Sequence, residues 1–281
     1  MRNSILYGDC RETLKQFASY TDKARMCVTS PPYYGLRDYG GEENQIGQEQ
    51  SPEDFIKNLV EVFGLVRDCL TDDGTLWVNI GDSYYNYRPG KGQAYPKQSV
   101  SKTKQDLPDK CNKRGNKLEG LKEKDLIGIP WMLAFALRAD GWYLRQDIIW
   151  SKGNPMPESV RDRCTKSHEY IFLLSKSQNY YFDVDTIKEQ SRRKRSVWSV
   201  NVKPNKQSHF ATYPPELITP CILAGSEEND IVLDPFMGSG TTAMVARSLG
   251  RYYIGCELHE EYNNLIQERV PVNILSTISP T

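Results

Sequence analysis

The sequence has few histidines, no paired cysteine motif and no long hydrophobic run, and each absence excludes a class of protein. Three histidines and seven cysteines are scattered through 281 residues, and no two cysteines have Cys-x-x-Cys spacing. We therefore expect neither a metal site nor a disulfide framework. The longest mainly apolar stretch, residues 127–137, is too short to cross a bilayer, and the first ten residues lack the apolar core of a signal peptide. These features predict a reduced, cytoplasmic protein with no membrane partner.

The sequence also lacks net charge, because 36 Lys and Arg balance 36 Asp and Glu. The charge is nevertheless unevenly distributed. Residues 84–128 hold 11 basic and 5 acidic side chains, and residues 188–206 hold 7 basic and 1 acidic, including Arg192, Arg193, Lys194 and Arg195. A solvated loop explains either segment by itself. Two such segments on an otherwise acidic chain are more typical of a surface that binds the phosphate groups of a nucleic-acid backbone.

The most informative pattern lies near the C-terminus, where an apolar strand at residues 231–233 leads through Asp234 into a glycine turn. Gly238 and Gly240 allow backbone to approach a ligand closely, and residues 241–249 have helical character. Residues 251–257 form a second expected strand, which ends at Glu257, and a carboxylate at that position can accept both hydroxyls of a ribose. Strand, turn, helix, strand and acid together predict a nucleoside site.

Other segments alternate strands with helices, which predicts a mainly parallel sheet in a single α/β unit. We expect strands at residues 5–7, 26–29, 75–80 and 142–150, and an antiparallel hairpin formed by residues 169–174 and 180–182. Helices are expected at residues 11–20, 52–70, 125–138 and 215–224. Only 47 residues follow Asp234, so the nucleoside half comes last and the chain looks circularly permuted.

Polar or stiff residues follow three of the expected strands, at Asp9, at residues 30–33 and at Asp82. Strand ends at one sheet edge form the ligand crevice of open α/β folds. Within Ser30-Pro31-Pro32-Tyr33, the prolines fix an extended turn that directs carbonyl oxygens and a hydroxyl to one point. Such a turn can accept hydrogen bonds from an amino group while the Tyr33 ring stacks on the planar ring that carries it.

Two motifs, TSPPY at residues 29–33 and DPFMGSGTT at residues 234–242, carry a family resemblance. Together with four shorter blocks, they make the chain resemble the S-adenosylmethionine-dependent DNA amino-methyltransferases of the β class. These blocks are NIGDSY at 79–84, WSK at 150–152, HEYIF at 168–172 and HFATYP at 209–214. In that class the catalytic motif precedes the cofactor motif. The resemblance covers nearly the whole chain and implies a Rossmann-like class I methyltransferase fold.

The resemblance also implies roles for particular residues. Ser30 and the Pro31 carbonyl would hold the target amino group, Pro32 would stiffen the turn, and Tyr33 would stack on the base. Asp9 with Cys10 would read the adenine of the cofactor, and Glu257 its ribose. The remaining expected cofactor residues are His209, Pro214, Asp234, Pro235, Phe236, Gly238, Ser239, Gly240, Thr241, Thr242 and Leu258.

Ser-Pro-Pro-Tyr accompanies cytosine-N4 methylation in this family, whereas Asp or Asn in the first position accompanies adenine-N6 methylation. Ser30 therefore favours cytosine, with adenine-N6 as the alternative. Double-stranded DNA is the expected substrate, and the target base has to leave the stack to reach the site. Thr219-Pro220-Cys221 invites comparison with carbon-5 cytosine methylases, which attack through a thiolate. We expect Cys221 instead to be a buried structural thiol, because it lies within an apolar helix.

Five segments are expected. The catalytic half is expected to consist of residues 1–83 and 125–183, which are separated by a basic insert, residues 84–124, that contacts DNA. A short target-recognition segment follows at residues 184–208, and the cofactor half comprises residues 209–281. Arg192, Arg193, Lys194 and Arg195 are the expected phosphate contacts. The resemblance suggests a restriction-modification or phage setting, with a cognate endonuclease and a monomer or weak dimer. A catalytically silent DNA-binding protein and a nicotinamide oxidoreductase remain alternatives.

Overall fold

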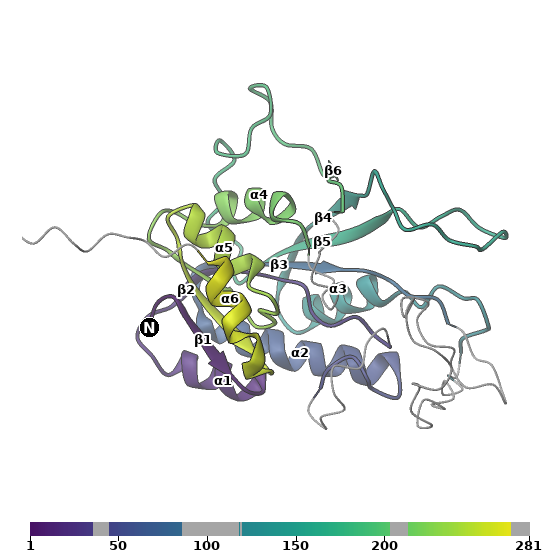
Figure 1. Cartoon of the computed structure of the whole chain (residues 1–281), viewed down its shortest axis with the longest axis horizontal. Helices are drawn as coiled ribbons and strands as arrows, with labels where there is room; N and C mark the ends of the chain where they lie inside the picture. Colours follow the sequence, from purple (N-terminus) through teal and green to yellow (C-terminus); the bar gives the residue numbers. More distant parts are fainter. Residues whose placement is uncertain (36–44, 86–117, 119, 203–212, 271–281) are drawn as a thin grey trace, which may run out of the picture.

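The protein is a three-layer α/β structure in which helices cover both faces of one eight-stranded sheet (Figure 1). The computed structural model describes residues 1–35, 45–85, 118, 120–202 and 213–270. The strand order is β1-β8-β7-β2-β3-β5-β4-β6. The strands are β1 (Ser4–Tyr7), β2 (Ala24–Thr29), β3 (Leu70–Ile80), β4 (Tyr143–Ser151), β5 (His168–Ser175), β6 (Val197–Ser199), β7 (Ile231–Asp234) and β8 (Tyr252–Glu257).

The sheet is parallel except around β5, which runs antiparallel to both β3 and β4. The expected mainly parallel sheet with an antiparallel segment is confirmed. The carboxyl ends of the other seven described strands therefore meet at one edge of the sheet.

Two apolar clusters hold the helices on the sheet. One cluster joins one face of the sheet to α1 (Cys10–Ala18), α2 (Pro52–Cys69) and α3 (Ile129–Ala139). The other joins the opposite face to α4 (Pro215–Gly225), α5 (Thr241–Ser248) and α6 (Asn263–Arg269). Successive residues of β2 point to opposite faces, so Cys27 belongs to the first cluster and Met26 and Val28 to the second. Two-sided burial explains why β2 is almost continuously apolar.

Helix α2 begins where its sequence predicts. The Ser51 hydroxyl accepts a hydrogen bond from the backbone N–H of Asp54 at 3.1 Å, and Pro52 occupies the first helical position. The apolar side chains of α2 form one buried face over the sheet, which includes Phe55, Leu59 and Phe63. This helix therefore covers the face of the sheet to which Cys27 of β2 points.

The prediction that residues 180–182 form a hairpin with β5 is wrong. Residues 180–182 form no strand; instead β5 pairs with β4 on one side and β3 on the other, which leaves it no free edge. The aromatic residues of this segment pack or pair elsewhere: Phe182 stacks on Trp77 at 6.1 Å between ring centroids, and the Tyr180 hydroxyl accepts a hydrogen bond from Arg145. Two short elements, β6 and α6, were not expected from the sequence.

Within the described ranges, no helix is long and apolar enough to span a membrane. No group of three or more His, Cys, Asp or Glu side chains with metal-binding geometry occurs in the same ranges.

Candidate functional site

The candidate site lies along the carboxyl edge of five neighbouring strands. In sheet order these are β1, β8, β7, β2 and β3, which lead into Asp9, Glu257, the 235–240 turn, Ser30 and Gly81 respectively. Cys27 of β2 is in register with Leu233 of β7. The structure thus brings the two motifs, which are 205 residues apart at Thr29 and Asp234, onto adjacent strands.

A hydrogen bond joins the two motifs directly. The Thr29 hydroxyl donates to Asp234 Oδ1 at 2.6 Å, and both residues are buried. The other carboxylate oxygen accepts from the hydroxyls of Tyr213, at 3.2 Å, and Thr242. The backbone N–H of Phe236 also donates to Oδ1 at 3.0 Å. Burial raises the pKa of Asp234 above its ordinary value, although these donors act in the opposite direction.

The glycine turn has the conformation that its sequence requires. Gly238 and Gly240 have φ of 53° and 80°, values that favour glycine, and Gly240 begins α5. The backbone N–H of Gly238 donates to Glu257 Oε2 at 2.8 Å, and that of His259 donates to Oε1 at 3.0 Å. Burial raises the pKa of the Glu257 carboxyl. The turn after β7 is therefore tied to the acid at the end of β8.

Arg269 of α6 supports the same turn, a contact not expected from the sequence. Its guanidinium donates to the Ser239 carbonyl oxygen at 2.9 Å, to the Ser239 hydroxyl, and to Thr241 Oγ1 at 3.3 Å. Burial lowers the pKa of Arg269. The side chains of Asp234, Ser239 and Thr242 are all occupied by internal partners, so the structure gives them a scaffolding role; direct contact with a cofactor stays a prediction for each.

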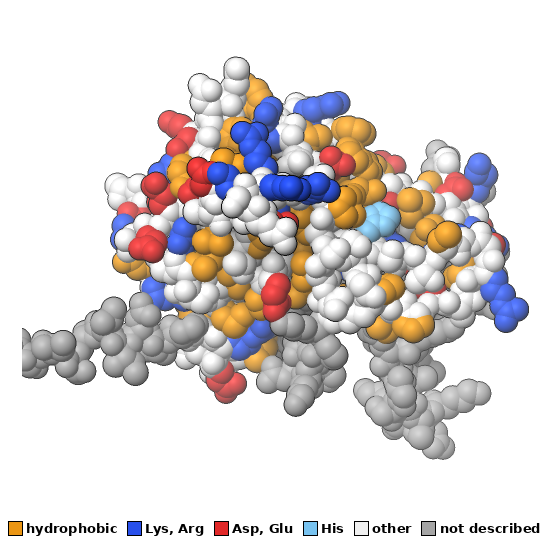
Figure 2. Space-filling model, turned by 90° about the horizontal axis from the view of Figure 1, so that it is seen from above, with side chains coloured by type: hydrophobic (Ala, Val, Ile, Leu, Met, Phe, Trp, Pro, Cys, Tyr) orange, Lys and Arg blue, Asp and Glu red, His pale blue; other side chains and the backbone are white. Residues whose placement is uncertain are grey.

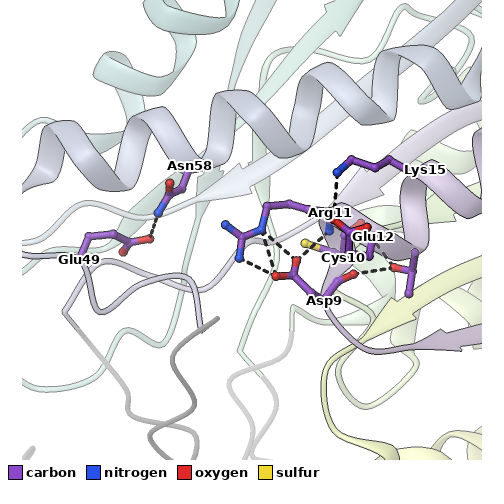
Figure 3. Close-up of polar contacts among 8 residues, drawn as sticks. Asp9, Cys10, Arg11, Glu12, Lys15, Glu49 and Asn58 are labelled. Atoms are coloured by element: carbon purple, nitrogen blue, oxygen red, sulfur yellow. Dashed lines mark hydrogen bonds and ion pairs between the residues drawn. The ribbon is translucent and has the colours of Figure 1, made fainter.

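Asp9 lies immediately after β1, beside the end of β8, because Tyr7 is in register with Glu257. Its carboxylate is engaged by Arg11, whose Nε lies 3.0 and 3.1 Å from the two oxygens and whose Nη2 lies 2.5 Å from Oδ2. Figure 3 shows this fork and the neighbouring Glu49–Asn58 pair. Partial burial acts to raise the pKa of Asp9, but the hydrogen bonds from Arg11 outweigh it and lower the pKa. Asp9 is thus held as an oriented anion.

Cys10 follows Asp9 as the first residue of α1 and is buried. Burial raises the pKa of its thiol to about 12, so the side chain stays protonated at neutral pH. Pro235 and Phe236 lie in the turn after β7, and Leu258 follows β8, so all three border the same edge. Pro214 is the residue before α4 and is buried. His209, the other cofactor residue expected from that block, lies outside the described residues.

At the expected catalytic motif, Ser30 follows β2, and its hydroxyl has no hydrogen-bond partner among the residues that the structure describes. Pro31 is buried and Pro32 is partly buried, whereas Tyr33 extends its hydroxyl to Glu169 Oε2 at 2.6 Å. Asp82, also expected at this edge, accepts from the backbone N–H groups of Gly128 and Ile129 at the start of α3. Its carboxylate therefore fixes α3 to the end of β3.

The four expected DNA contacts lie in the segment before β6, above α4 in Figure 1. Seen from above, Lys and Arg side chains gather on this part of the molecule (Figure 2). Lys194 differs from its neighbours because its ammonium pairs with Glu189 and lies 5.0 Å from the centroid of the Trp198 ring. Arg192 and Arg193 are exposed. Most of the basic insert, residues 86–117 and 119, lies outside the described residues.

Cys221 occupies the middle of α4 and is completely buried. Burial raises the pKa of its thiol well above the ordinary value, and its Sγ lies 3.7 Å from the Leu217 carbonyl oxygen. A thiol in this environment is not a nucleophile at neutral pH.

Comparison with known proteins identifies the family. A family model described as DNA methylase matches residues 24–268. The type II methyltransferase M.Cfr9I of Citrobacter freundii is 49% identical over 272 residues, which cover 95% of this chain and 87% of the relative. M.SmaI of Serratia marcescens, also a type II methyltransferase, is 50% identical over 278 residues, covering 95% and 90% of the two chains.

Solved structures agree on the fold. The PvuII DNA methyltransferase, described as cytosine-N4-specific, matches with a TM-score of 0.69 at 19% identity, covering 98% of this chain and 89% of that one. TTHA0409 of Thermus thermophilus, solved with S-adenosyl-L-methionine, matches with a TM-score of 0.63 at 25% identity, covering 95% and 92%. Together with the family match over most of the chain, these comparisons show that the protein belongs to the N6 and N4 DNA methylase family.

Proposed function

We propose that this protein transfers a methyl group from S-adenosylmethionine to the exocyclic N4 of cytosine in double-stranded DNA, as the methyltransferase of a type II restriction-modification system. The observation that carries the proposal is the Thr29–Asp234 hydrogen bond, because it fixes the catalytic turn beside the cofactor turn. The type II relatives support the biological setting, with a cognate endonuclease as a functional partner and the cytoplasm as the compartment. The late position of β7 and β8 fits a circularly permuted class I fold.

The described residues fit this cofactor. Gly238 and Gly240 have no side chains to keep a ligand away from the backbone of the turn, and acids lie at the ends of two strands, Asp9 just after β1 and Glu257 as the last residue of β8. Glu257 would accept hydrogen bonds from the ribose hydroxyls, and Asp9 from the adenine amino group. The backbone around Phe236, Gly238 and Gly240 would face the methionine part. When bound, the cofactor supplies an electrophilic methyl group on its sulfonium sulfur.

The catalytic turn supplies acceptors for the target amino group. The lone pair of an exocyclic amine is delocalised into its ring, which makes the amine a weak nucleophile. The Ser30 hydroxyl and the Pro31 carbonyl can accept hydrogen bonds from the two N–H groups, which draws the lone pair back to nitrogen. Ser30 and the Pro31 carbonyl would hold the amine while it takes the methyl group from the sulfonium, and the proton that the nitrogen then releases would pass to water. Positioning supplies much of the rate, since nitrogen, methyl carbon and sulfur must be collinear.

The choice of cytosine rests on Ser30, because the family resemblance associates Ser-Pro-Pro-Tyr with cytosine-N4 methylation. The test is to incubate the purified protein with duplex DNA and labelled S-adenosylmethionine, digest the product and identify the labelled nucleoside. We expect N4-methyl-2′-deoxycytidine. Recovery of N6-methyl-2′-deoxyadenosine would contradict the cytosine assignment, while leaving amino-methylation of DNA in place.

A matched pair of variants separates catalysis from binding. Ser30→Ala removes the hydroxyl, and we expect a large fall in kcat with little change in cofactor affinity, because Ser30 makes no hydrogen bond with the described residues. Ser83→Ala, the same change three residues after the end of β3, serves as the control. If wild-type protein binds DNA but transfers no methyl group to any sequence, it is a catalytically silent member of the family.

A further inference from the structure

A charged pair, Lys152 and Glu169, lies next to Tyr33 of the catalytic turn and has no role in the function described so far. Lys152 follows the end of β4 and Glu169 lies near the start of β5, opposite Trp150 in the register of the two strands. The ammonium contacts Glu169 Oε1, and the two side chains are 18% and 12% exposed. Lys152 Nζ also lies 4.4 Å from the centroid of the Trp150 ring. This pair is thus largely shielded from solvent and held on an aromatic face.

The second oxygen of Glu169 faces the catalytic turn. Oε2 accepts from the Tyr33 hydroxyl at 2.6 Å and from Asn79 Nδ2 at 3.3 Å. Asn79 is itself fixed, because its Nδ2 also donates to the Tyr170 carbonyl oxygen at 3.1 Å. Both carboxylate oxygens therefore have partners: Oε1 contacts the Lys152 ammonium, and Oε2 accepts from Tyr33 and Asn79. The carboxylate connects the end of β4 to the ring at the end of the catalytic turn.

Gly81 allows these groups to approach one another. A Cβ at this position would lie 2.9 Å from Tyr33 Cε2 and 3.3 Å from the Glu169 carboxyl carbon. Any larger residue would therefore displace the ring or the carboxylate. The position of the Tyr33 ring is thus restricted at its hydroxyl by Glu169 and at its edge by the backbone of Gly81.

We propose that Glu169, oriented by Lys152, is a positioning residue for methyl transfer: it holds the Tyr33 hydroxyl and so fixes the plane on which the target base stacks. The inference rests on the proposed function through the stacking role of Tyr33. A hydrogen bond to a partly buried carboxylate is among the stronger ones in proteins, and a planar base can bring its amino nitrogen into line only if the ring beneath it is fixed. The pair acts on the transfer step and not on cofactor binding.

The test is a double-mutant cycle on Tyr33→Phe and Glu169→Ala, with kcat, KM for DNA and cofactor affinity measured for each variant. Tyr33→Phe keeps the stacking ring and removes only the tethering hydroxyl. We expect each single variant to lose about tenfold or more in kcat with unchanged cofactor affinity, since each removes the same charge-assisted hydrogen bond. The double variant should be no slower than the slower single variant.

Two further variants sharpen the design. Tyr180→Phe makes the same chemical change at a tyrosine whose hydroxyl accepts from Arg145, outside the catalytic turn, and should leave kcat unchanged. Combining Lys152→Met with Glu169→Gln removes both charges and keeps an oxygen that accepts from Tyr33, so it should recover most of the activity lost in Glu169→Ala. Equal losses in these two Glu169 variants would contradict the positioning role.

The outcomes also distinguish this inference from the proposed function. If wild-type protein makes N4-methylcytosine and Tyr33→Phe is as fast as wild type, the positioning role is refuted and the function stands. Multiplicative losses in the double variant would likewise refute it, because the two side chains would then act independently. A wild-type protein that makes no methylcytosine would refute the proposed function.

Discussion

Thr29→Val should destabilise the protein by removing the hydrogen bond that joins the two motifs. Valine has nearly the shape of threonine, so the change replaces a donor with a methyl group against a buried carboxylate oxygen. Thr29 is 0% and Asp234 1% exposed, so water cannot replace the lost donor. Losing a hydrogen bond to a buried charged group costs about 1.5–3 kcal/mol. The Phe236 N–H still donates to the same oxygen, which places the expected loss near the lower end of this range.

The loss should depend on pH. Burial raises the pKa of Asp234 in the folded protein, and the Thr29 hydrogen bond partly offsets that rise. A group with a raised pKa in the folded protein favours folding when it is protonated. For Asp234 this contribution to the free energy of unfolding is complete at pH values below the pKa of the carboxyl in the unfolded chain. It is lost as the pH rises through the pKa of the carboxyl in the folded protein. Thr29→Val raises the folded pKa further. Its deficit relative to wild type should therefore be largest above the folded pKa and should shrink as the pH falls and Asp234 becomes protonated.

Urea unfolding followed by circular dichroism, at several pH values from neutral to acidic, measures both effects. Thr29→Ser is the matched control, because it keeps the hydroxyl and loses only a methyl group, at a cost of about 1 kcal/mol. Its deficit should not change with pH. If Thr29→Val stays within about 0.5 kcal/mol of wild type at neutral pH, or if its deficit is independent of pH, the hydrogen bond does not stabilise the contact between the motifs.

Three further predictions concern cofactor, thiol and DNA. Burial raises the pKa of Glu257, so cofactor affinity measured by calorimetry should weaken as the pH falls through that pKa; Glu257→Gln should bind weakly and without this acid-side dependence. Cys221→Ala should keep the methylation rate within about twofold of wild type, because burial keeps the thiol protonated, and a large loss in rate beyond any loss of folded protein would point to thiolate chemistry. Arg193→Gln should reduce the salt dependence of DNA binding by about one unit of slope in filter binding, whereas Lys194→Gln should change it less, because Lys194 already pairs with Glu189. Equal effects of the last two variants would contradict this assignment.

The sequence was most informative where a local rule determines the backbone. The positive φ of Gly238 and Gly240 and the cap of α2 by Ser51 both follow from residue type at a given position. The sheet edge could also be anticipated, since parallel strands place their carboxyl ends together. These features suffice to put the two motifs at one site.

Other features depend on tertiary packing and leave no local signal. The direction of the Asp234 side chain is one example: a motif shows that an acid follows β7 but not that its oxygens point inward to Thr29 and Tyr213. Strand β6 is another, because Val197–Ser199 is too short to show a period and pairs only because β4 has a free edge. The Glu169–Tyr33 contact spans 136 residues and has no sequence spacing to reveal it.

The strand order has a consequence for biosynthesis. Strands β7 and β8 lie between β1 and β2 in the sheet but follow the other strands in the chain. While the ribosome is still making residues 231–257, β1 has no partner and β2 is paired on one side only. At about 5–20 residues per second, about ten seconds or more separate the synthesis of β2 from that of β7. During this interval an apolar strand edge is open to other chains, which makes the nascent protein a candidate client for chaperones.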